Sequence, residues 1–558
     1  MIFSCDFETT TDPDDCRVWG YGIHAVGKDD FICGNSLDNF MKWCRLQPKA
    51  TLYFHNLKFD GEFIIHWLLS HKFQHEKDKR NNGPNTFNTL ISDRGMFYSI
   101  EIIWDNEIKP GTNNRTKIYD SLKVLPFSVD KVAKAFDLPI SKLKIDYDEY
   151  REPGHILTQQ EVDYIKNDVA IIAKALPHLF DQKLNKMTQG SNALADYKKV
   201  IGKKHFEKWF PILDYEVDKQ IRQSYKGGFT YLNPIFKKKD LDRGIVLDVN
   251  SLYPSVMYDC LLPYGEPVAF TGRYKKDTDY PLYTQMISCS FRIKKNHIPT
   301  IQIKNNLAFR PTEYLENSNG EEIVLTLCNP DLYLFLQHYD VFNLEWLGGW
   351  KYKASSGMFT KYIDKWYKIK EQATIEGNEP LRTLAKLMLN ALYGKFGTNP
   401  NVRSKIPYLD ENGLVKYKLG EKETRDPVYI PVATFVTSYA RNKTISSAQK
   451  VYDRFVYADT DSLHLIGTDI PECLDVHQSR LGAWKHESTF EKARFLRQKT
   501  YIEQINEKIH ITCAGMPDRC YDGVTWDNFH NGMSYTGKLR FVHVPGGIVL
   551  LDTPFTIK

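Results

Sequence analysis

This sequence contains no long apolar run. No stretch approaches the roughly 20 residues that a membrane-spanning helix requires. Near the N-terminus, Asp6 and Glu8 fall where a signal peptide needs an uninterrupted apolar segment. We therefore predict a cytosolic protein that does not associate with a membrane.

The sequence also lacks the cysteine spacings of metal sites and disulfide frameworks. None of its ten cysteines forms a C-x-x-C pair or falls at the spacing of a zinc site; they are scattered at positions 5, 16, 33, 44, 260, 289, 328, 473, 513 and 520. This pattern predicts free, mostly structural thiols in a reducing compartment.

Internal repeats and low-complexity tracts are absent as well, and the net charge of +5 is too small to require a polyanionic partner. What is present is a chain of ordinary composition, 42% hydrophobic and 26% charged. At 558 residues it is too long for one compact core, so we expect two or more domains.

The first 190 or so residues show an α/β pattern, in which short apolar strands alternate with helical stretches. Ile2–Cys5 and Leu52–Phe54 are predicted to be strands. Thr158 and Glu161 form a capping box that opens a helix, and Thr188–Ser191 is interpreted as a junction.

From about residue 225 the pattern changes to strands separated by loops rich in proline and glycine. Gly244–Val249 is predicted to be a strand, and Arg454–Ile466 a hairpin with Asp459 and Asp461 at its tip. The longest helical region covers residues 359–396, with an interruption at 376–380.

Two carboxylates lie together at the end of the first predicted strand. Asp6 and Glu8 are separated by one residue, and side chains at i and i+2 on a strand point to the same face. Two carboxylates on one face disfavour folding unless they share a cation. Their hard oxygen ligands suit Mg²⁺ or Mn²⁺. A lone D-x-E is more often a solvated loop end, so the interpretation needs further support.

That support comes from two other segments. Asp60 follows the second strand at the start of a helix, and Tyr164 and Asp168 share one face of the capped helix at i, i+4 spacing. Together with Asp6 and Glu8, these acids would form a four-carboxylate, two-metal site for phosphodiester hydrolysis. Tyr164 could orient the attacking water.

A second set of carboxylates lies far downstream. Asp248 is delivered by a buried-looking strand, and Asp459 and Asp461 occupy the predicted hairpin tip. Three converging acids would hold two metals for in-line attack of a 3′-hydroxyl on an α-phosphate. Taken alone, the Asp459–Asp461 segment would equally be a plain polar β-turn.

A predicted helix between these acids carries polar groups on one face. Lys386, Asn390 and Tyr393 supply the cation and the aromatic ring that a triphosphate and a nascent base pair require. Arg382, one turn earlier, and Lys370 on the preceding helix add phosphate-binding charge. For any single one of them, a solvated helix face is the alternative.

The first carboxylate set resembles the three exonuclease motifs of proofreading DNA polymerases, because D-x-E, N-x-x-F-D and Y-x-x-x-D occur in that order. The resemblance implies a ribonuclease-H-like 3′→5′ exonuclease in which Lys142 contacts the scissile phosphate. It also implies that the single-stranded 3′ end is held, partly by aromatic stacking, by Thr9, His55, Asn56, Phe59, Ser121 and Leu122.

The second set resembles motifs A, B and C of family B DNA polymerases: D-x-x-S-L-Y-P, K-x(3)-N-x-x-Y-G and Y-x-D-T-D-S. The resemblance implies that Asp248 and Asp461 are the principal metal ligands, with Asp459 and the Val249 carbonyl beside them. Tyr253 would stack under the incoming sugar and exclude a 2′-hydroxyl. The remaining implied roles are checking of the nascent pair by Tyr393 and Asn390, and triphosphate binding by Lys386, Lys370 and Arg382.

Three shorter signatures resemble DNA-contact motifs of the same family. They are the Y-x-G-G template-strand motif at Tyr225, Gly227 and Gly228, a template- and primer-contact motif at Thr437 and Arg441, and the K-x-Y motif at Lys499 and Tyr501, whose lysine contacts a primer phosphate. The last is preceded by the densest basic cluster in the chain, which suits phosphate contact.

The spacing between the motifs resembles that of the protein-primed polymerases of small Bacillus phages. Over 130 residues separate motifs A and B, and over 60 separate B and C. By resemblance, Cys260–Gly357 would be an insertion that binds the terminal protein. A second insertion, Asn399–Thr424, would encircle DNA and open the downstream duplex.

The predicted fold is a multidomain α/β and α+β chain, with a ribonuclease-H-like exonuclease domain followed by a right-hand polymerase domain of palm, fingers and thumb. The predicted layout is the exonuclease at 1–190, the palm start with the Y-x-G-G linker and motif A at 191–259, insertion 1 at 260–357, the fingers with motif B at 358–398, insertion 2 at 399–424, the palm with motif C and K-x-Y at 425–502, and the thumb at 503–558.

We predict a monomeric, protein-primed and strand-displacing replicase of a linear viral genome, with proofreading, in the cytoplasm of an infected bacterium. Its partners would be template and primer DNA, dNTPs and a terminal protein, with two Mg²⁺ or Mn²⁺ ions in each active site. The alternatives are a DNA-primed family B plasmid or repair polymerase, and a nuclease whose downstream half is a nucleic-acid-binding scaffold. Intact Asp248, Asp459 and Asp461 argue against the scaffold.

Overall fold

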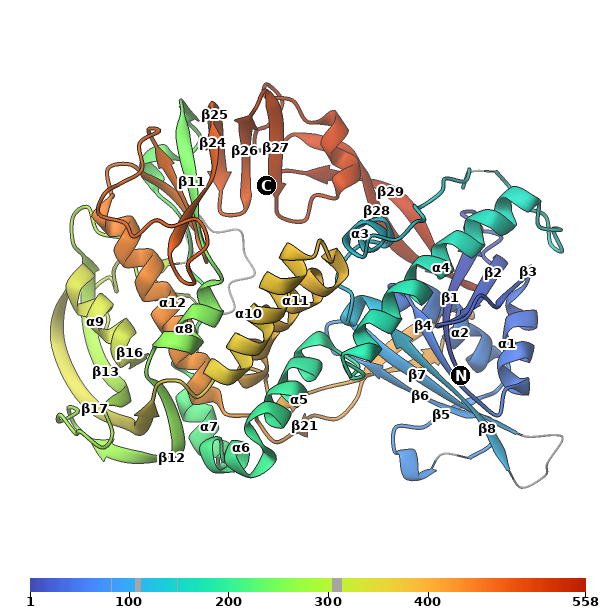
Figure 1. Cartoon of the computed structure of the whole chain (residues 1–558), viewed down its shortest axis with the longest axis horizontal. Coiled ribbons are helices and arrows are strands. Elements are labelled where there is room, and N and C mark those ends of the chain that lie inside the picture. The colour runs from blue at the N-terminus through green and yellow to red at the C-terminus, as the bar shows by residue number, and fades with distance from the viewer. Residues whose placement is uncertain (82, 106–111, 148, 304–313) are drawn as a thin grey trace.

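A computed structural model describes residues 1–558 except 82, 106–111, 148 and 304–313, so part of predicted insertion 1 lies outside the described residues. The N-terminal unit lies at one end of the molecule, and helices α10 (Thr360–Ile375) and α11 (Glu379–Phe396) lie between it and the remaining β-rich part (Figure 1). In the described part of the chain, no helix is long and apolar enough to cross a bilayer.

The N-terminal unit is built on an eight-stranded mixed sheet with the order β3-β2-β1-β4-β8-β7-β6-β5. Its strands are β1 (Ile2–Thr9), β2 (Val18–Ala25), β3 (Phe31–Gly34), β4 (Lys49–Phe54), β5 (Gln74–His75), β6 (Thr86–Ile91), β7 (Phe97–Asp105) and β8 (Asn113–Asp120). Its helices are α1 (Leu37–Leu46), α2 (Leu57–Ser70), α3 (Val129–Ala135) and α4 (Gln159–Asp181). The alternation of strands and helices confirms the predicted α/β character of this region.

Two local predictions for this unit need correction. Strand β1 continues to Thr9 rather than ending at Cys5, because it pairs with β2 from Phe3 to Thr9 and this pairing outweighs the polarity of its last residues. The Thr158 capping box is confirmed, but the predicted junction at Thr188–Ser191 is the first turn of helix α5 (Gln189–Ile201). Thr188 caps that helix through the Ser191 N–H, so the connection between the two helices is residues 182–188.

The second unit is centred on a five-stranded antiparallel sheet with the order β24-β11-β23-β22-β9. The predicted strand Gly244–Val249 is confirmed as β11, and the predicted hairpin is confirmed as β22 (Phe455–Asp459) and β23 (Ser462–Ile466). The outer strands are β9 (Thr230–Leu232) and β24 (Trp484–Phe490), and helices α8 (Leu252–Asp259) and α12 (Ile430–Lys450) pack on each other nearby.

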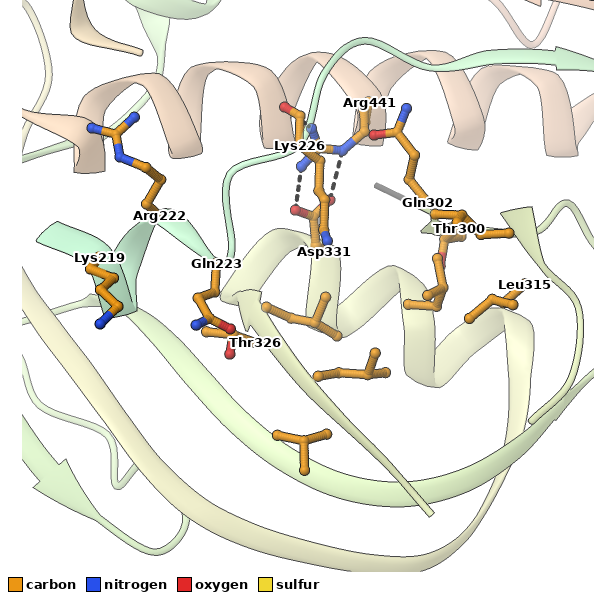
Figure 2. Close-up of a pocket in the computed structure, with 15 residues that line it drawn as sticks. Lys219, Arg222, Gln223, Lys226, Thr300, Gln302, Leu315, Thr326, Asp331 and Arg441 are labelled. Carbon is orange, nitrogen blue, oxygen red and sulfur yellow. Dashed lines mark hydrogen bonds and ion pairs between the residues drawn. The ribbon is translucent and has the colours of Figure 1, made fainter. Parts of the chain in front are cut away.

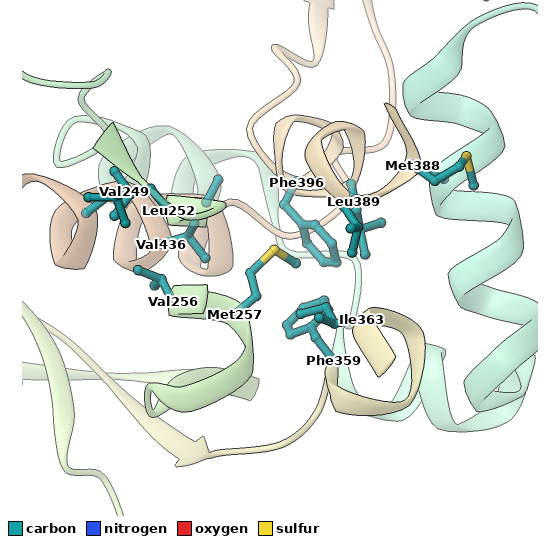
Figure 3. Packing of buried hydrophobic residues seen from close by; sticks show 14 of the residues in the cluster. Val249, Leu252, Val256, Met257, Phe359, Ile363, Met388, Leu389, Phe396 and Val436 are labelled. Atoms are coloured by element: carbon teal, nitrogen blue, oxygen red, sulfur yellow. The ribbon is translucent and has the colours of Figure 1, made fainter. Parts of the chain in front are cut away.

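The predicted break in the longest helical region is confirmed between α10 and α11. Asn378 caps α11 and Pro380 lies in its first turn, where its missing N–H costs no hydrogen bond. Figure 3 shows how one core joins these helices to the sheet unit: Met257 of α8 lies among Phe359, Phe396 and Leu389. Full burial of a side chain of this size contributes about 1.5–3 kcal/mol, so the helices are firmly seated.

Residues 260–303 and 314–357 contain a separate antiparallel sheet with the order β12-β17-β13-β16, at one side of the molecule (Figure 1). Its strands are β12 (Leu262–Thr271), β13 (Leu282–Ile293), β16 (Ile323–Cys328) and β17 (Tyr339–Ser355), with helix α9 (Asn329–His338) before the last. The short strands β14 (Ile301–Gln302) and β15 (Tyr314–Leu315) pair beside it.

Residues 399–424 form a projecting arm of two short ladders. Strand β18 (Asn401–Val402) pairs with β21 (Glu423–Thr424), and β19 (Lys405–Leu409) pairs with β20 (Val415–Leu419). The arm reaches the N-terminal unit, since Val415 is buried in the core of that unit.

The C-terminal region contains two β structures. Strands β10 (Asp240–Leu241), β25 (Lys492–Arg497), β26 (Thr500–Ile505) and β27 (Lys508–Cys513) form a sheet, and the predicted palm–thumb boundary at 502 falls inside β26. A hairpin of β28 (Ser534–Val544) and β29 (Gly547–Thr556) then returns to the N-terminal unit, where Ile548 and Val549 enter its core (Figure 1).

Candidate active sites

The four predicted exonuclease carboxylates lie at one end of the N-terminal sheet. Asp6 and Glu8 occupy alternate positions of β1, Asp60 lies in the first turn of α2, and Asp168 lies on α4. The backbone N–H of Phe7 donates to Asp60 Oδ1 at 3.2 Å, which ties α2 to β1.

Burial and mutual repulsion raise the proton affinity of these acids. Burial, followed by the charge on Asp168, raises the pKa of Asp6 to about 7. Burial and the charge on Asp6 also raise the pKa of both Glu8 and Asp60. Carboxylates that repel one another in a buried site are the arrangement that a shared cation stabilises.

Lys142 and Tyr164 also lie at this site, as predicted. The Lys142 ammonium is 3.0 Å from Asp168 Oδ2, while Asp168 Oδ1 is buried without a hydrogen-bond partner among the described residues. The hydroxyl of Tyr164 is hydrogen-bonded to that of Tyr147, a residue that the sequence reasoning missed. Tyr147 lies five positions after Lys142 in a segment without regular structure, where no periodicity marks it.

Five of the six predicted single-strand contacts are at least partly exposed beside this site, and the sixth, Ser121, is buried. His55 Nδ1 is 2.9 Å from Ser121 Oγ, and Ser121 is fully buried, so it supports His55. Asp120, which the sequence reasoning missed, accepts the backbone N–H groups of Asn56 and Leu122 at 3.0 Å each. One carboxylate therefore orients both predicted DNA-contact segments. Thr9, Asn56, Phe59 and Leu122 are partly or fully exposed.

The polymerase carboxylates meet where the β22–β23 hairpin pairs with β11. Asp248 and Asp459 both face Ser462 in the register of the sheet, and the Val249 N–H donates to the Asp461 carbonyl at 2.8 Å. Burial, followed by the charge on Asp461, raises the pKa of Asp248 to about 7. Burial also raises the pKa of Asp461, and Asp459 adds to that increase.

Asp459 has close polar partners in the same site. Its carboxylate accepts from Thr230 Oγ1 at 3.0 Å and lies 3.2 Å from the Lys499 ammonium. The tip residue Thr460 adopts φ of +60° and donates its N–H to the Phe229 carbonyl. Gly228 must be glycine here, because a Cβ atom would lie 2.5 Å from Thr460 Oγ1.

The predicted nucleotide-binding residues lie on α8, α10 and α11. Tyr253 stacks on Tyr393 with ring centroids 4.0 Å apart, so motifs A and B share one aromatic surface. Burial and the positive charges of Lys386 and Arg382 lower the pKa of Lys370. Three cations gathered from two helices form a surface that suits a polyphosphate. Asn390 is exposed on α11, which also carries Arg382 and Lys386.

Lys485 of β24 also belongs to this site and was missed by the sequence reasoning. It faces Asp248 across the sheet, and its charge counters the raised pKa of that acid. Its position becomes apparent only from the pairing of β11 with β24, which are more than 200 residues apart in the chain.

The motifs at Tyr225–Gly228 and Thr437–Arg441 meet beside a cavity of about 530 Å³ (Figure 2). The buried Arg441 donates to the carbonyls of Lys226 and Gly227 at 2.9 and 2.8 Å, and its Nε lies 3.2 Å from an oxygen of Asp331. Arg441 therefore supports the Y-x-G-G segment, whereas Thr437 is buried and bonds only its own helix. Tyr225 is partly buried, and Tyr501 stacks on Phe495 at 4.8 Å.

The donor chemistry of both sets fits a hard divalent cation. No group of three or more His, Cys, Asp or Glu side chains is gathered for chelation within residues 1–558 outside the four undescribed segments. Instead, one lysine ammonium lies against one carboxylate in each set, Lys142 on Asp168 and Lys499 on Asp459. A divalent cation would bind the unpartnered Asp168 oxygen and would offset the repulsion that raises the pKa of Asp6 and Asp248. The residues present therefore fit such a cation.

Comparison with known proteins agrees with this geometry. The family model of DNA polymerase type B, organellar and viral, matches residues 43–156 and 147–479. The DNA polymerase of Bacillus phage B103 is 48% identical over 579 aligned residues, covering 100% of this chain and 99% of that protein. The DNA polymerase of Streptococcus phage Cp-1 is 34% identical, covering 100% of this chain and 98% of that protein.

A solved structure of phi29 DNA polymerase with primer-template DNA matches the whole of both chains, with a TM-score of 0.94 and 48% identity. Another, with primer-template DNA and incoming nucleotides, matches with a TM-score of 0.93. These matches confirm the predicted multidomain fold with exonuclease and polymerase domains. The chain therefore belongs to the family B DNA polymerases of the organellar and viral type, and it is a nucleotidyltransferase that copies DNA.

Proposed function

We propose that this enzyme is the protein-primed replicase of a linear phage genome, and that it combines strand displacement with 3′→5′ proofreading. The observation that carries the proposal is the presence of two separate carboxylate sets, together with folded segments between the polymerase motifs, at 260–303 and 314–357 and at 399–424. Its partners would be template and primer DNA, dNTPs and a terminal protein. The enzyme would act as a monomer in the cytoplasm of the infected bacterium.

Each carboxylate set would hold two Mg²⁺ or Mn²⁺ ions, which supply charge stabilisation and an activated oxygen nucleophile when bound. Asp6, Glu8, Asp60 and Asp168 would hold those of the exonuclease, and Asp248, Asp459, Asp461 and the Val249 carbonyl those of the polymerase. Glu8, Asp60 and Asp168 are buried and the acids of the polymerase set are partly buried, so reduced contact with water would strengthen the ionic contacts in each site.

The side chains around each set would bind and orient the DNA. In the polymerase site, Lys370, Arg382 and Lys386 would bind the triphosphate, and the stacked Tyr253 and Tyr393 would support the sugar and the nascent pair. In the exonuclease site, Lys142 would contact the scissile phosphate, and Tyr164 would orient the attacking water through its hydroxyl, which Tyr147 fixes.

Proofreading needs an unpaired 3′ end at the exonuclease site. The exposed surface of Asn56, Phe59 and Leu122 lies beside that site and would hold such an end through stacking and polar contacts. The Phe59 ring is 6.5 Å from that of Phe541 in the C-terminal hairpin, so the thumb would form one wall of this path.

Strand displacement would depend on the arm at residues 399–424. Its Tyr417 hydroxyl donates to Glu62 of α2 at 2.7 Å, and its Glu423 lies 2.7 Å from the ammonium of Lys77. These contacts fix the arm against the N-terminal unit and would leave a passage that only single-stranded template can enter.

Deletion of residues 399–424 tests this role. The two strands at the base of the arm are paired, and Arg425 donates its N–H to the Pro400 carbonyl at 2.9 Å, so a short glycine linker can join Thr398 to Arg425. We expect extension of primed single strands to persist and synthesis through duplex to be lost, as measured on a nicked template. A deletion variant that still displaces a strand at the full-length rate would contradict the assignment.

Protein priming is tested by incubating the enzyme with a candidate terminal protein and labelled dNTP. We expect a covalent protein–nucleotide adduct that disappears in the Asp248→Ala variant, because the same site would join the nucleotide to a hydroxyl of the protein. An enzyme that extends DNA primers but forms no adduct would instead be the DNA-primed type.

A further inference from the structure

A buried polar contact lies behind the motif C hairpin. His464 Nδ1 of β23 is 2.7 Å from Glu503 Oε1 of β26, and both residues are buried. The contact therefore joins the five-stranded sheet, which carries Asp248 and Asp459, to the β10–β25–β26–β27 sheet, which carries the K-x-Y motif. Neither residue belongs to a motif in the sequence.

The ring of Tyr457 lies between this contact and the catalytic acids. Its centroid is 5.3 Å from that of His464 and 5.2 Å from that of Tyr501. Its hydroxyl accepts the backbone N–H of Lys499 at 3.0 Å and lies 3.4 Å from Asp459 Oδ2. One tyrosine hydroxyl thus contacts both the K-x-Y turn and a carboxylate of the active site.

Lys499 depends on that support. It adopts φ of +53°, a left-handed conformation that is uncommon for a residue with a side chain and persists only when the surroundings enforce it. From this turn its ammonium reaches Asp459 Oδ2 at 3.2 Å. The Lys499 carbonyl also accepts the Ala514 N–H at 2.7 Å, so the Tyr457 hydroxyl is one of two groups that hold this backbone. A shift of that hydroxyl would free the Lys499 N–H and move the ammonium relative to the acid.

We infer that His464 and Glu503 are positioning residues for the primer terminus. Their hydrogen bond fixes the imidazole against the Tyr457 ring, and Tyr457 in turn holds the turn that presents Lys499 beside Asp459. Two apolar side chains at these positions could join the sheets equally well. A hydrogen bond, unlike an apolar contact, also fixes the orientation of the imidazole. The inference rests on the proposed contact of Lys499 with a primer phosphate.

The test compares primer binding with chemistry in the His464→Leu variant, which removes the hydrogen bond. We expect the Kd for primer-template DNA to rise about tenfold, or about 1.4 kcal/mol, within the range for a hydrogen bond to a charged group. The rate of dNTP incorporation at saturating primer should fall by less than the affinity does, since the nucleotide-binding residues on α8, α10 and α11 are unaltered and only the support of Asp459 by Lys499 is weakened.

Two further variants show whether the bond itself is responsible. His464→Asn places an amide nitrogen close to the position of Nδ1, so it should restore most of the affinity. His510→Leu makes the same change at the exposed residue that faces Glu503 in the β26–β27 ladder, and it should leave binding unchanged. If His464→Asn binds primer as weakly as His464→Leu, the inference is wrong, because the loss of affinity would then come from the altered shape of the side chain and not from the lost hydrogen bond.

A second readout is the balance between synthesis and degradation. A loosened primer terminus should move more often to the exonuclease, so His464→Leu should need more dNTP to switch from degradation to extension. Its degradation of free single strands should equal that of the wild type. Glu503→Gln, which retains side-chain size, should show the same shift to a smaller degree and serves if His464→Leu does not fold.

The Lys499→Ala variant separates this inference from the proposed function. If Lys499→Ala binds primer normally, the proposed role of Lys499 fails. If Lys499→Ala weakens binding while a folded His464→Leu variant binds and partitions as the wild type does, only the positioning role of His464 and Glu503 is overturned.

Discussion

Glu62 on α2 provides a quantitative test of how the arm at residues 399–424 and the C-terminal hairpin are docked on the N-terminal unit. Its carboxyl is buried and accepts the Tyr417 hydroxyl of β20 at 2.7 Å, and His543 Nδ1 of β28 lies 3.9 Å away. The positive charges facing it come from Lys58 of α2 itself and Lys405 of β19. Burial outweighs these charges and raises the pKa of Glu62 from 4.5 to about 7.

The size and the sign of the effect follow from that pKa. A difference of about 2.5, at about 1.36 kcal/mol for each pKa unit, corresponds to about 3 kcal/mol. Above pH 7, Glu62 is ionised in both folded and unfolded chains, and its burial destabilises the fold by this amount. As the pH falls from 7 to 4.5, the folded protein takes up the proton first and the penalty disappears.

We therefore expect Glu62→Gln to stabilise the docked arm at pH 8 by up to about 3 kcal/mol and to have a much smaller effect at pH 5. Hydrogen exchange of α2 and β20 amides measures this local opening free energy. Glu411→Gln, at an exposed position of the same arm, is the matched control. If the effect of Glu62→Gln is equal at both pH values, or larger at pH 5, the buried charge of Glu62 does not destabilise the docked arm.

Three other outcomes are expected. Lys142→Ala should slow single-strand degradation by about 10- to 100-fold and leave synthesis unchanged, since its ammonium contacts only the exonuclease set; equal loss in both assays would argue against separate sites. Tyr253→Val should increase ribonucleotide incorporation by about tenfold or more, because the ring stacked on Tyr393 would no longer block a 2′-hydroxyl; unchanged discrimination would remove Tyr253 from this role. Chelation of divalent metal should abolish both activities reversibly, with Mg²⁺ or Mn²⁺ restoring them, and activity that persists in excess chelator would contradict the proposed metal requirement.

The sequence predicted those parts of the fold in which a local pattern also determines the structure. The motif-bearing strand at Gly244–Val249, the hairpin around Asp459 and the break between α10 and α11 each depend on nearby residues, and all were confirmed. The predicted end of the first strand at Cys5 was wrong, because pairing with β2, rather than local polarity, determines where β1 stops.

The missed site residues depend on contacts between distant segments. Asp120 binds the Asn56 N–H from a different strand, and Lys485 faces Asp248 from more than 200 residues away. Asp331, in α9, holds Arg441 of α12. None of them lies in a periodic or motif-like context, so only the folded chain shows their positions.

The sequence also contains no local pattern that predicts where the C-terminal hairpin docks. Gly546 donates its N–H to His66 at 3.1 Å, a contact between residues 480 positions apart. A turn of Pro-Gly-Gly predicts a tight bend, but it does not indicate which surface the bend will meet. The contact between the C-terminal hairpin and the N-terminal unit is therefore determined by the tertiary structure alone.

The central claim is that two carboxylate sets support two separable activities, and a paired assay tests it most directly. Primer extension and single-strand degradation are measured for Asp248→Ala and Asp6→Ala, with Asp29→Ala at an exposed position as the control. We predict that Asp248→Ala loses synthesis but still degrades single strands, and that Asp6→Ala does the reverse. Loss of both activities in either folded variant, or synthesis by Asp248→Ala at the wild-type rate, would contradict the account.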